Sequence, residues 1–165
     1  MRPVTERDIR TSFVNCSKGE AQRLGLPKDF ADLPWDDLDF LGWQDPGAPA
    51  RSYLVAERDG RLVGIALRTA SSSARGFTAR SMCSLCLTTR TSGGVALMTA
   101  RRTGEAGRQG NSVGQYLCGD LDCSLYVRDK KRSVASGVLD ETISTEEKVA
   151  RIRANLHTFL DKVIQ

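Results

Sequence analysis

The chain has 165 residues, of which 40% are hydrophobic and 27% charged, values typical of a soluble globular protein. No apolar run approaches the roughly 18 residues that a membrane span requires. The N-terminus lacks the apolar stretch of a secretory signal. We therefore expect a cytoplasmic protein that forms a single domain over residues 1–165.

The formal net charge of +4 is unevenly distributed along the chain. Residues 28–59 carry eight acidic and three basic residues, whereas residues 75–132 carry ten basic and four acidic residues. Such asymmetry favours a charged partner, although a solvated surface without a partner can have the same composition.

Two short helices are predicted within the first 26 residues. Thr5 is a favoured residue for a helix N-cap, and Ser17 and Glu20 have the spacing of a capping box. Gly25 follows the second helix and ends it.

Residues 28–50 are acidic and contain prolines, which favours irregular structure. The side chains of Trp35, Phe40 and Trp43 are too apolar for a free linker. We expect an irregular segment held against the body of the protein by its aromatic residues.

A β-hairpin is predicted over residues 52–58 and 61–68. The two strands flank Asp59-Gly60, a pair that suits a two-residue turn because both positions need a positive φ. An exposed loop is expected at residues 71–76.

The second half of the chain predicts a turn at residues 91–94 and a strand at 95–101. Residues 103–114 contain four glycines and are expected to be irregular, and a helix at 121–128 would carry Cys123 in its first turn. A long amphipathic helix is predicted at about 145–164, with a capping box at Ser144 and Glu147. His157 lies off its apolar stripe and is not expected to be a ligand.

Four of the five cysteines form two close pairs with the spacing of a metal site. Two residues separate Cys83 from Cys86, and four separate Cys118 from Cys123. In a reducing compartment such clusters indicate metal binding rather than disulfides. Four thiolates complete the tetrahedral coordination of Zn²⁺ and leave no position open for water, so we expect one structural zinc ion.

Two other roles are compatible with clustered cysteines. A Cys-x-x-Cys pair also occurs in thiol oxidoreductases, but the βαβ context of that motif is missing here. Four thiolates also suit an iron–sulfur cluster. The fifth cysteine, Cys16, is expected to be a small buried residue.

The sequence contains no recognisable catalytic arrangement. The single histidine has no adjacent serine–carboxylate context, and the glycine-rich segment lacks the ending of a phosphate-binding loop. We therefore expect a protein that is not an enzyme.

Three stretches resemble a known family. They are Cys83-Ser-Leu-Cys86, then Gly104-Glu-Ala-Gly-Arg-Gln-Gly-Asn-Ser-Val-Gly-Gln-Tyr116, then Leu117-Cys-Gly-Asp-Leu-Asp-Cys123-Ser-Leu-Tyr-Val-Arg128. They resemble the C-terminal treble-clef zinc-finger domain (FBP domain) of the fibronectin-binding/FusB-type proteins, which bind elongation factor G. The resemblance places the zinc finger at about residues 75–130.

The resemblance implies a binding protein that acts on translation at the ribosome through elongation factor G. Relatives that confer fusidic acid resistance help the factor leave the ribosome when the drug has trapped it. Those relatives carry an additional N-terminal helical bundle that is not part of this sequence. They also have a histidine at one ligand position where this chain has cysteine.

A basic contact surface for such a partner is expected beside the zinc site, and its proposed members are Arg101, Arg102, Arg108, Tyr116 and Arg128, with Lys130, Lys131 and Arg132 on the rim. Each of these can equally be an ordinary solvated side chain. The alternative function is binding to the ribosome or rRNA without elongation factor G, although the basic stretch lacks an aromatic stacking platform.

The expected fold class is α+β. A treble-clef zinc finger is joined to a small antiparallel sheet, with short N-terminal helices and a long C-terminal helix.

Overall fold

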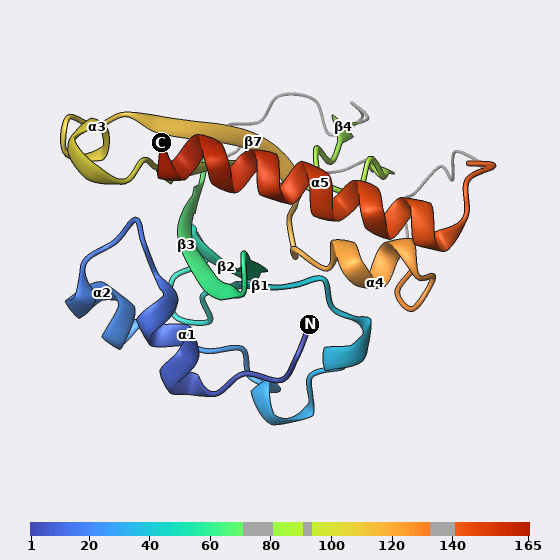
Figure 1. Ribbon diagram of the computed structural model, residues 1–165, viewed down its shortest axis with the longest axis horizontal. Coiled ribbons are helices and arrows are strands. Elements are labelled where there is room, and N and C mark those ends of the chain that lie inside the picture. Colours follow the sequence, from blue (N-terminus) through green and yellow to red (C-terminus); the bar gives the residue numbers. More distant parts are fainter. Residues whose placement is uncertain (71–80, 91–93, 133–140) are drawn as a thin grey trace.

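The computed structural model describes residues 1–70, 81–90, 94–132 and 141–165. The loop expected at 71–76 and most of the turn expected at 91–94 lie outside these ranges. The fold is α+β, as expected, and is built on a five-stranded antiparallel sheet with the strand order β1-β2-β3-β6-β7. Figure 1 shows the long helix α5 on one side of this sheet and the N-terminal helices on the other.

The strands of the sheet are β1 (Phe40–Gln44), β2 (Arg51–Arg58), β3 (Arg61–Thr69), β6 (Val95–Arg101) and β7 (Ser112–Cys118). The predicted hairpin is β2–β3, and Asp59 and Gly60 in its turn have φ of 49° and 74°. A separate two-stranded ribbon pairs β4 (Ser81–Met82) with β5 (Thr89–Arg90).

One face of the sheet is covered by α5 (Thr145–Ile164), the predicted C-terminal amphipathic helix. Its apolar stripe is buried at Ile152, Leu156, Phe159, Leu160 and Val163. These side chains share a core cluster with buried residues of the sheet and with all four paired cysteines. The metal-site cysteines are therefore part of the main core.

The other face of the sheet is covered in part by α1 (Glu6–Ser12), α2 (Lys18–Arg23) and the 3₁₀ turns η1 (Phe30–Asp32) and η2 (Trp35–Asp37). Both α-helices begin at the predicted caps, Thr5 and Ser17, each within a full capping box. Arg10 of α1 donates from Nη1 to the carbonyl oxygens of Ala21, Gln22 and Leu24, which fixes the end of α2.

The close approach of α1 to the sheet depends on Gly64 in β3. A Cβ atom at this position would lie 2.5 Å from Ser12 Oγ, and Val14 donates its backbone N–H to the Gly64 carbonyl at 2.9 Å. Only a residue without a side chain fits there.

Two expectations of irregular structure were wrong in part. Residues 40–44 form β1, whose Leu41 and Trp43 pack toward the N-terminal helices, while Phe40 packs on the α5 side. Within residues 103–114, a five-residue helix α3 (Gly104–Arg108) precedes β7, which begins at Ser112. The aromatic residues of 28–50 do hold that segment against the body, because Phe40 and Trp43 are buried.

Among the described residues, no helix has the length and apolar character needed to cross a bilayer.

Candidate metal centre

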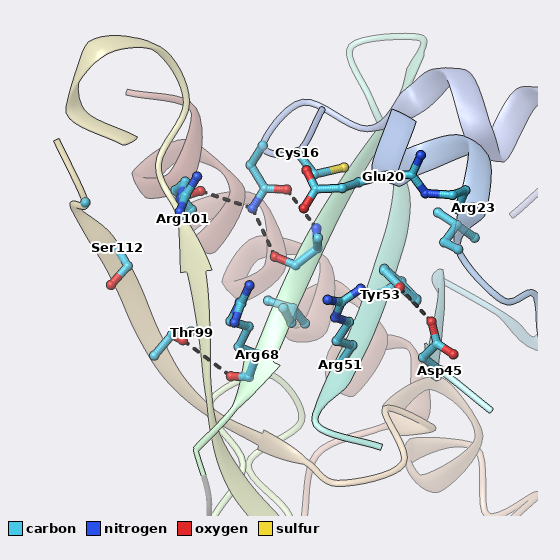
Figure 2. A pocket seen from close by; sticks show the side chains of 15 residues that line it. Cys16, Glu20, Arg23, Asp45, Arg51, Tyr53, Arg68, Thr99, Arg101 and Ser112 are labelled. Atoms are coloured by element: carbon cyan, nitrogen blue, oxygen red, sulfur yellow. Dashed lines mark hydrogen bonds between the residues drawn. The ribbon is translucent and has the colours of Figure 1, made fainter. Parts of the chain in front are cut away.

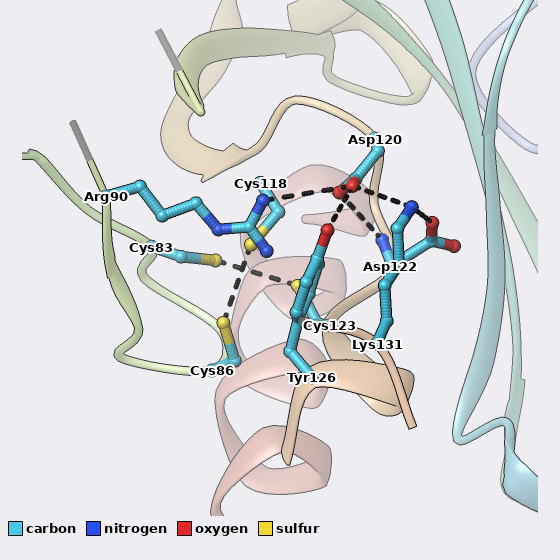
Figure 3. A network of polar contacts seen from close by, with 9 residues as sticks. All are labelled: Cys83, Cys86, Arg90, Cys118, Asp120, Asp122, Cys123, Tyr126 and Lys131. Atoms are coloured by element: carbon cyan, nitrogen blue, oxygen red, sulfur yellow. Dashed lines mark hydrogen bonds and ion pairs between the residues drawn. The ribbon is translucent and has the colours of Figure 1, made fainter. Parts of the chain in front are cut away.

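The four cysteines reach one point from three elements. Cys83 and Cys86 lie on the turn between β4 and β5, Cys118 ends β7, and Cys123 begins α4 (Cys123–Val127). All four sulfur atoms lie within 4.8 Å of one another, and all four residues are buried. Figure 3 shows their side chains converging from these separate segments.

The spacing of the sulfur atoms suits a tetrahedral metal ion. The Sγ atoms of Cys83 and Cys123 are 3.7 Å apart, and those of Cys86 and Cys118 are 3.6 Å apart. A tetrahedron of thiolates at the usual Zn–S distance of about 2.3 Å has edges of about 3.8 Å. A disulfide would require a sulfur–sulfur distance of about 2.05 Å. The buried four-cysteine cluster thus fits one structural zinc ion, which when bound would be held by four protein ligands and polarise no substrate.

The crowded thiols cannot all ionise by themselves. Hydrogen bonds from Cys118 and Cys123 lower the pKa of the Cys83 thiol, whereas hydrogen bonding to Cys118 and then Cys83 raises the pKa of the Cys123 thiol. A divalent cation at the centre of the cluster stabilises all four thiolates together.

Arg90 supplies a second positive charge beside this cluster. Its side chain is only 5% exposed, and its guanidinium stacks 3.6 Å from the centroid of the Tyr126 ring. An Nη atom lies 3.8 Å from a carboxylate oxygen of Asp120, which also accepts a hydrogen bond from Tyr126 Oη. In Figure 3 the guanidinium lies between the thiol cluster and Asp120.

The charges around Arg90 keep it ionised. Burial alone would lower the pKa of Arg90, but the charge of Cys118 and the contacts with Tyr126 and Asp120 raise it overall. Its Nε and one Nη have no hydrogen-bond partner among the described residues. These N–H groups and the positive charge of Arg90 are therefore available to interact with the neighbouring cysteine sulfur atoms.

Helix α5 is fastened directly to the turn that carries the first cysteine pair. Asn155 donates from Nδ2 to the Leu85 carbonyl at 3.0 Å, and Arg151 donates to the Cys86 carbonyl at 3.5 Å. The metal centre thus holds the β4–β5 turn, the end of β7, α4 and α5 together.

The residues predicted as a partner surface are not brought together in one place. Arg128 makes a two-pronged ion pair with the fully buried Asp39, at 2.6 and 3.1 Å, and so joins α4 to the segment before β1. Arg102 donates from Nε to the Lys162 carbonyl near the end of α5. Both side chains are occupied by contacts that hold the fold.

The other three predicted residues are accessible. Arg108 on α3 is exposed and pairs with Glu105 at 2.7 Å. Arg101 and Tyr116 lie on β6 and β7 and face the same side of the sheet, because Arg101 pairs with Ser112 and Leu97 pairs with Tyr116. Tyr116 is 53% exposed. On the rim, Lys130 pairs with Asp37, and Lys131 with Asp120 and Asp122.

Sequence reasoning missed Arg90 and Asp39. Asp39 also accepts from Arg153, which lies 114 residues further along the chain, and no local spacing reports such a contact. For Arg90 the sequence offers only a weak signal, a basic residue four positions after a cysteine ligand. The predicted off-stripe position of His157 agrees with its exposure. Cys16 is only partly buried, and this burial raises the pKa of its thiol.

The comparisons with known proteins agree with this geometry. The model of the FBP C-terminal treble-clef zinc-finger family matches residues 8–163. No curated protein matches the chain. Among solved structures, the fusidic acid resistance protein FusC matches with a TM-score of 0.49 and 16% sequence identity. The match covers 86% of this chain and 51% of FusC, so the chain spans about half the length of that protein.

Proposed function

Because this chain belongs to the FBP C-terminal treble-clef zinc-finger family, we propose that it is a zinc-stabilised binding protein that binds elongation factor G and thereby acts on translation. The zinc ion has a structural role in this proposal, and the protein is not an enzyme. The chain is proposed to act in the cytoplasm, where its partner is found.

Two exposed apolar side chains, Met82 and Tyr116, lie on the elements that carry the cysteine ligands and support the proposal, together with the partly exposed Leu97. We call this surface the knuckle patch and define it as Met82, Leu97 and Tyr116. Met82 is 48% and Tyr116 is 53% exposed, and Leu97 is the direct cross-strand partner of Tyr116. The β4–β5 turn is joined to β7 by a hydrogen bond that the Ser84 backbone N–H donates to the Tyr116 carbonyl at 2.7 Å.

Such a patch suits a protein partner. Tyrosine is enriched among the residues that dominate binding energy at interfaces, because it combines a large apolar ring with a polar hydroxyl. The zinc ion makes the surface rigid, so that little conformational entropy is lost on binding. Arg101, on the same face, adds a positive charge suited to an acidic partner.

The direct test is a titration of the zinc-loaded protein against purified elongation factor G from the same organism. One-to-one binding is expected. The Tyr116→Ala variant should bind at least ~tenfold more weakly, since truncating a dominant interface residue costs about 2 kcal/mol or more. His157→Ala is the matched control, because His157 is exposed on α5 and lies outside the knuckle patch.

Equal binding by Tyr116→Ala and wild type would show that the contact surface lies elsewhere on the protein. No binding to the factor at all would contradict the proposal, and the alternative of ribosome or rRNA binding would take its place. Salt dependence identifies that alternative, since contacts with RNA phosphates weaken steeply as salt rises. The same titration with the factor held on ribosomes by fusidic acid tests the finer proposal of factor release.

A further inference from the structure

A hollow of about 590 Å³ lies on the sheet face that α1 and α2 leave partly open. We call it the arginine hollow and define it by Arg23, Arg51, Arg68 and Arg101, which line it from α2, β2, β3 and β6. Figure 2 shows Arg51 and Arg68 extending from the sheet toward the segment that carries Cys16 and Glu20. Its volume lies within the range of sites that bind small molecules.

The arginines of the hollow form no close ion pair among the described residues, although Glu20 lies near enough for the charges of Arg51 and Arg101 to help lower its pKa. None of the four side chains forms an ion pair within the parts of the chain that the structure describes. Arg51 and Arg68 are direct cross-strand partners in the β2–β3 register. Like charges in this arrangement destabilise a sheet, so a ligand of opposite charge would relieve a repulsion that the fold retains.

The two carboxylates in the hollow are already committed to local structure. Glu20 accepts from the backbone N–H and the hydroxyl of Ser17, and these hydrogen bonds lower its pKa. Asp45 accepts from Tyr53 Oη at 2.7 Å and from the Gly47 N–H at 2.8 Å. With both acids ionised, the four arginines still leave the lining with a net charge of +2.

The shape of the hollow is fixed by one amide side chain. Asn15 donates from Nδ2 to the carbonyls of Ala66 and Arg101, each at 3.0 Å, and accepts from the Ala66 N–H at 2.7 Å. This clamp joins the segment between α1 and α2 to β3 and β6. The arginines therefore project from a preformed frame, which lowers the entropy lost when a ligand binds.

The chemistry of the lining selects a class of ligand. Guanidinium groups present a planar fork of donors that matches phosphate oxygens. The four arginines converge on one hollow instead of following a groove, as the basic residues of a single-strand channel do. The one aromatic residue in the lining, Tyr53, is buried and hydrogen-bonded, so no ring is free to stack on a base.

We propose that the arginine hollow binds a compact ligand that carries two or more phosphate groups. Arg51 and Arg68 hold the phosphates from the sheet, and Arg23 and Arg101 approach from the two sides. This inference does not depend on elongation factor G: Arg101 is named in both proposals, but the variants that test them, at Tyr116 and at Arg51 and Arg68, do not overlap.

Isothermal titration of the zinc-loaded full chain with sodium pyrophosphate at constant ionic strength tests this proposal. Saturable one-to-one binding is expected, and the double variant Arg51→Gln/Arg68→Gln should bind at least ~tenfold more weakly. The matched control is Arg7→Gln/Arg61→Gln, which removes the same charge from exposed arginines outside the hollow. This control should bind like the wild type.

Folding of the double variant is checked by its melting temperature, which should equal or exceed that of the wild type because a like-charge pair is removed. Arg23→Gln, on α2, gives an independent variant that should also weaken binding. The proposal is overturned if pyrophosphate does not saturate the protein, or if the double variant and its control bind equally well.

Two further probes test whether the hollow prefers a different class of anionic ligand. A 12-nucleotide uridine RNA that binds more tightly than pyrophosphate would overturn the compact ligand in favour of a nucleic-acid backbone. A hexaglutamate peptide that displaces pyrophosphate at equal concentration would overturn it in favour of an acidic protein segment. Elongation factor G binding by the double variant is measured separately, so that failure of one proposal is not mistaken for failure of the other.

Discussion

Arg90 illustrates how a single buried charge can serve a metal centre without touching the metal. Four thiolates and one Zn²⁺ carry a net negative charge, and burial deprives that charge of solvation by water. The guanidinium of Arg90 lies beside the cluster, held in place by the Tyr126 ring and by Asp120. We therefore assign Arg90 a charge-balancing role at this site.

Replacing Arg90 by methionine should weaken zinc binding about tenfold or more, which is the usual effect of losing a residue that supports metal ligands. The zinc affinity of Arg90→Lys should lie between those of the wild type and Arg90→Met, because lysine keeps the charge but lacks the planar group that stacks on Tyr126. A competition titration with a zinc-binding chromophore measures the affinities, with the exposed Arg61→Met as control. Unchanged affinity in Arg90→Met would show that the charge of the cluster is balanced by other groups.

At the scale of elements, α5 depends on a start signal that is entirely local. Ser144 Oγ accepts from the Glu147 N–H at 3.2 Å, and the Glu147 carboxylate accepts from the Ser144 N–H at 2.7 Å. Because this helix covers a whole face of the sheet, its capping energy contributes to the stability of the entire protein.

Ser144→Ala should lower the free energy of unfolding by about 1 kcal/mol, the typical cost of losing an N-cap side chain. Urea denaturation at a fixed zinc concentration gives this value. Thr142→Ala, two residues earlier and equally exposed, is expected to leave stability unchanged. Similar losses in both variants would mean that the segment before α5, rather than the cap, sets the effect.

The elements that the sequence predicted correctly are those whose signals lie within a few residues. The capping boxes at Ser17 and Ser144 and the Asp59-Gly60 turn each specify their own geometry. β7 was missed because its exposed residues include Gly114, which has no side chain, and Tyr116, which is apolar, so that no polar–apolar alternation marks the strand and only its pairing with β6 defines it. β1 was missed because both of its faces are covered, which removes the alternation of a half-buried strand.

Of the candidate sites, the metal centre could be predicted from the sequence and the arginine hollow could not. The spacing of the cysteines was enough to predict the cluster, since each pair lies close together in the chain. The arginine hollow could not be foreseen, because its residues come from four elements and meet only when the sheet forms.

For the molecule as a whole, the metal centre and the N-terminal core share one sheet. The cluster with the cysteines lies on the α5 side, whereas Trp43 lies in the cluster beneath the N-terminal helices. Loss of zinc should therefore also destabilise the N-terminal core cluster, to which both tryptophans belong or against which they pack.

Removal of zinc by a strong chelator should lower the melting temperature of the protein, because metal-binding free energy is part of the folding free energy. The melt is followed by tryptophan fluorescence, which reports on the N-terminal core cluster and not on the cluster that contains the cysteines. Readdition of zinc in excess of the chelator should restore the original transition. Identical melting with and without chelator would contradict a structural role for the ion.

The position of α5 in the chain also has a consequence for biosynthesis. All four cysteine ligands precede α5, yet α5 supplies five of the buried side chains that close the main core. A growing polypeptide would thus expose the ligands to zinc before its hydrophobic core can close, and an ion captured at that stage would hold the strands while the helix is still being made. We expect a ribosome-stalled chain that ends shortly after α4 to retain zinc but to be cleaved rapidly by protease.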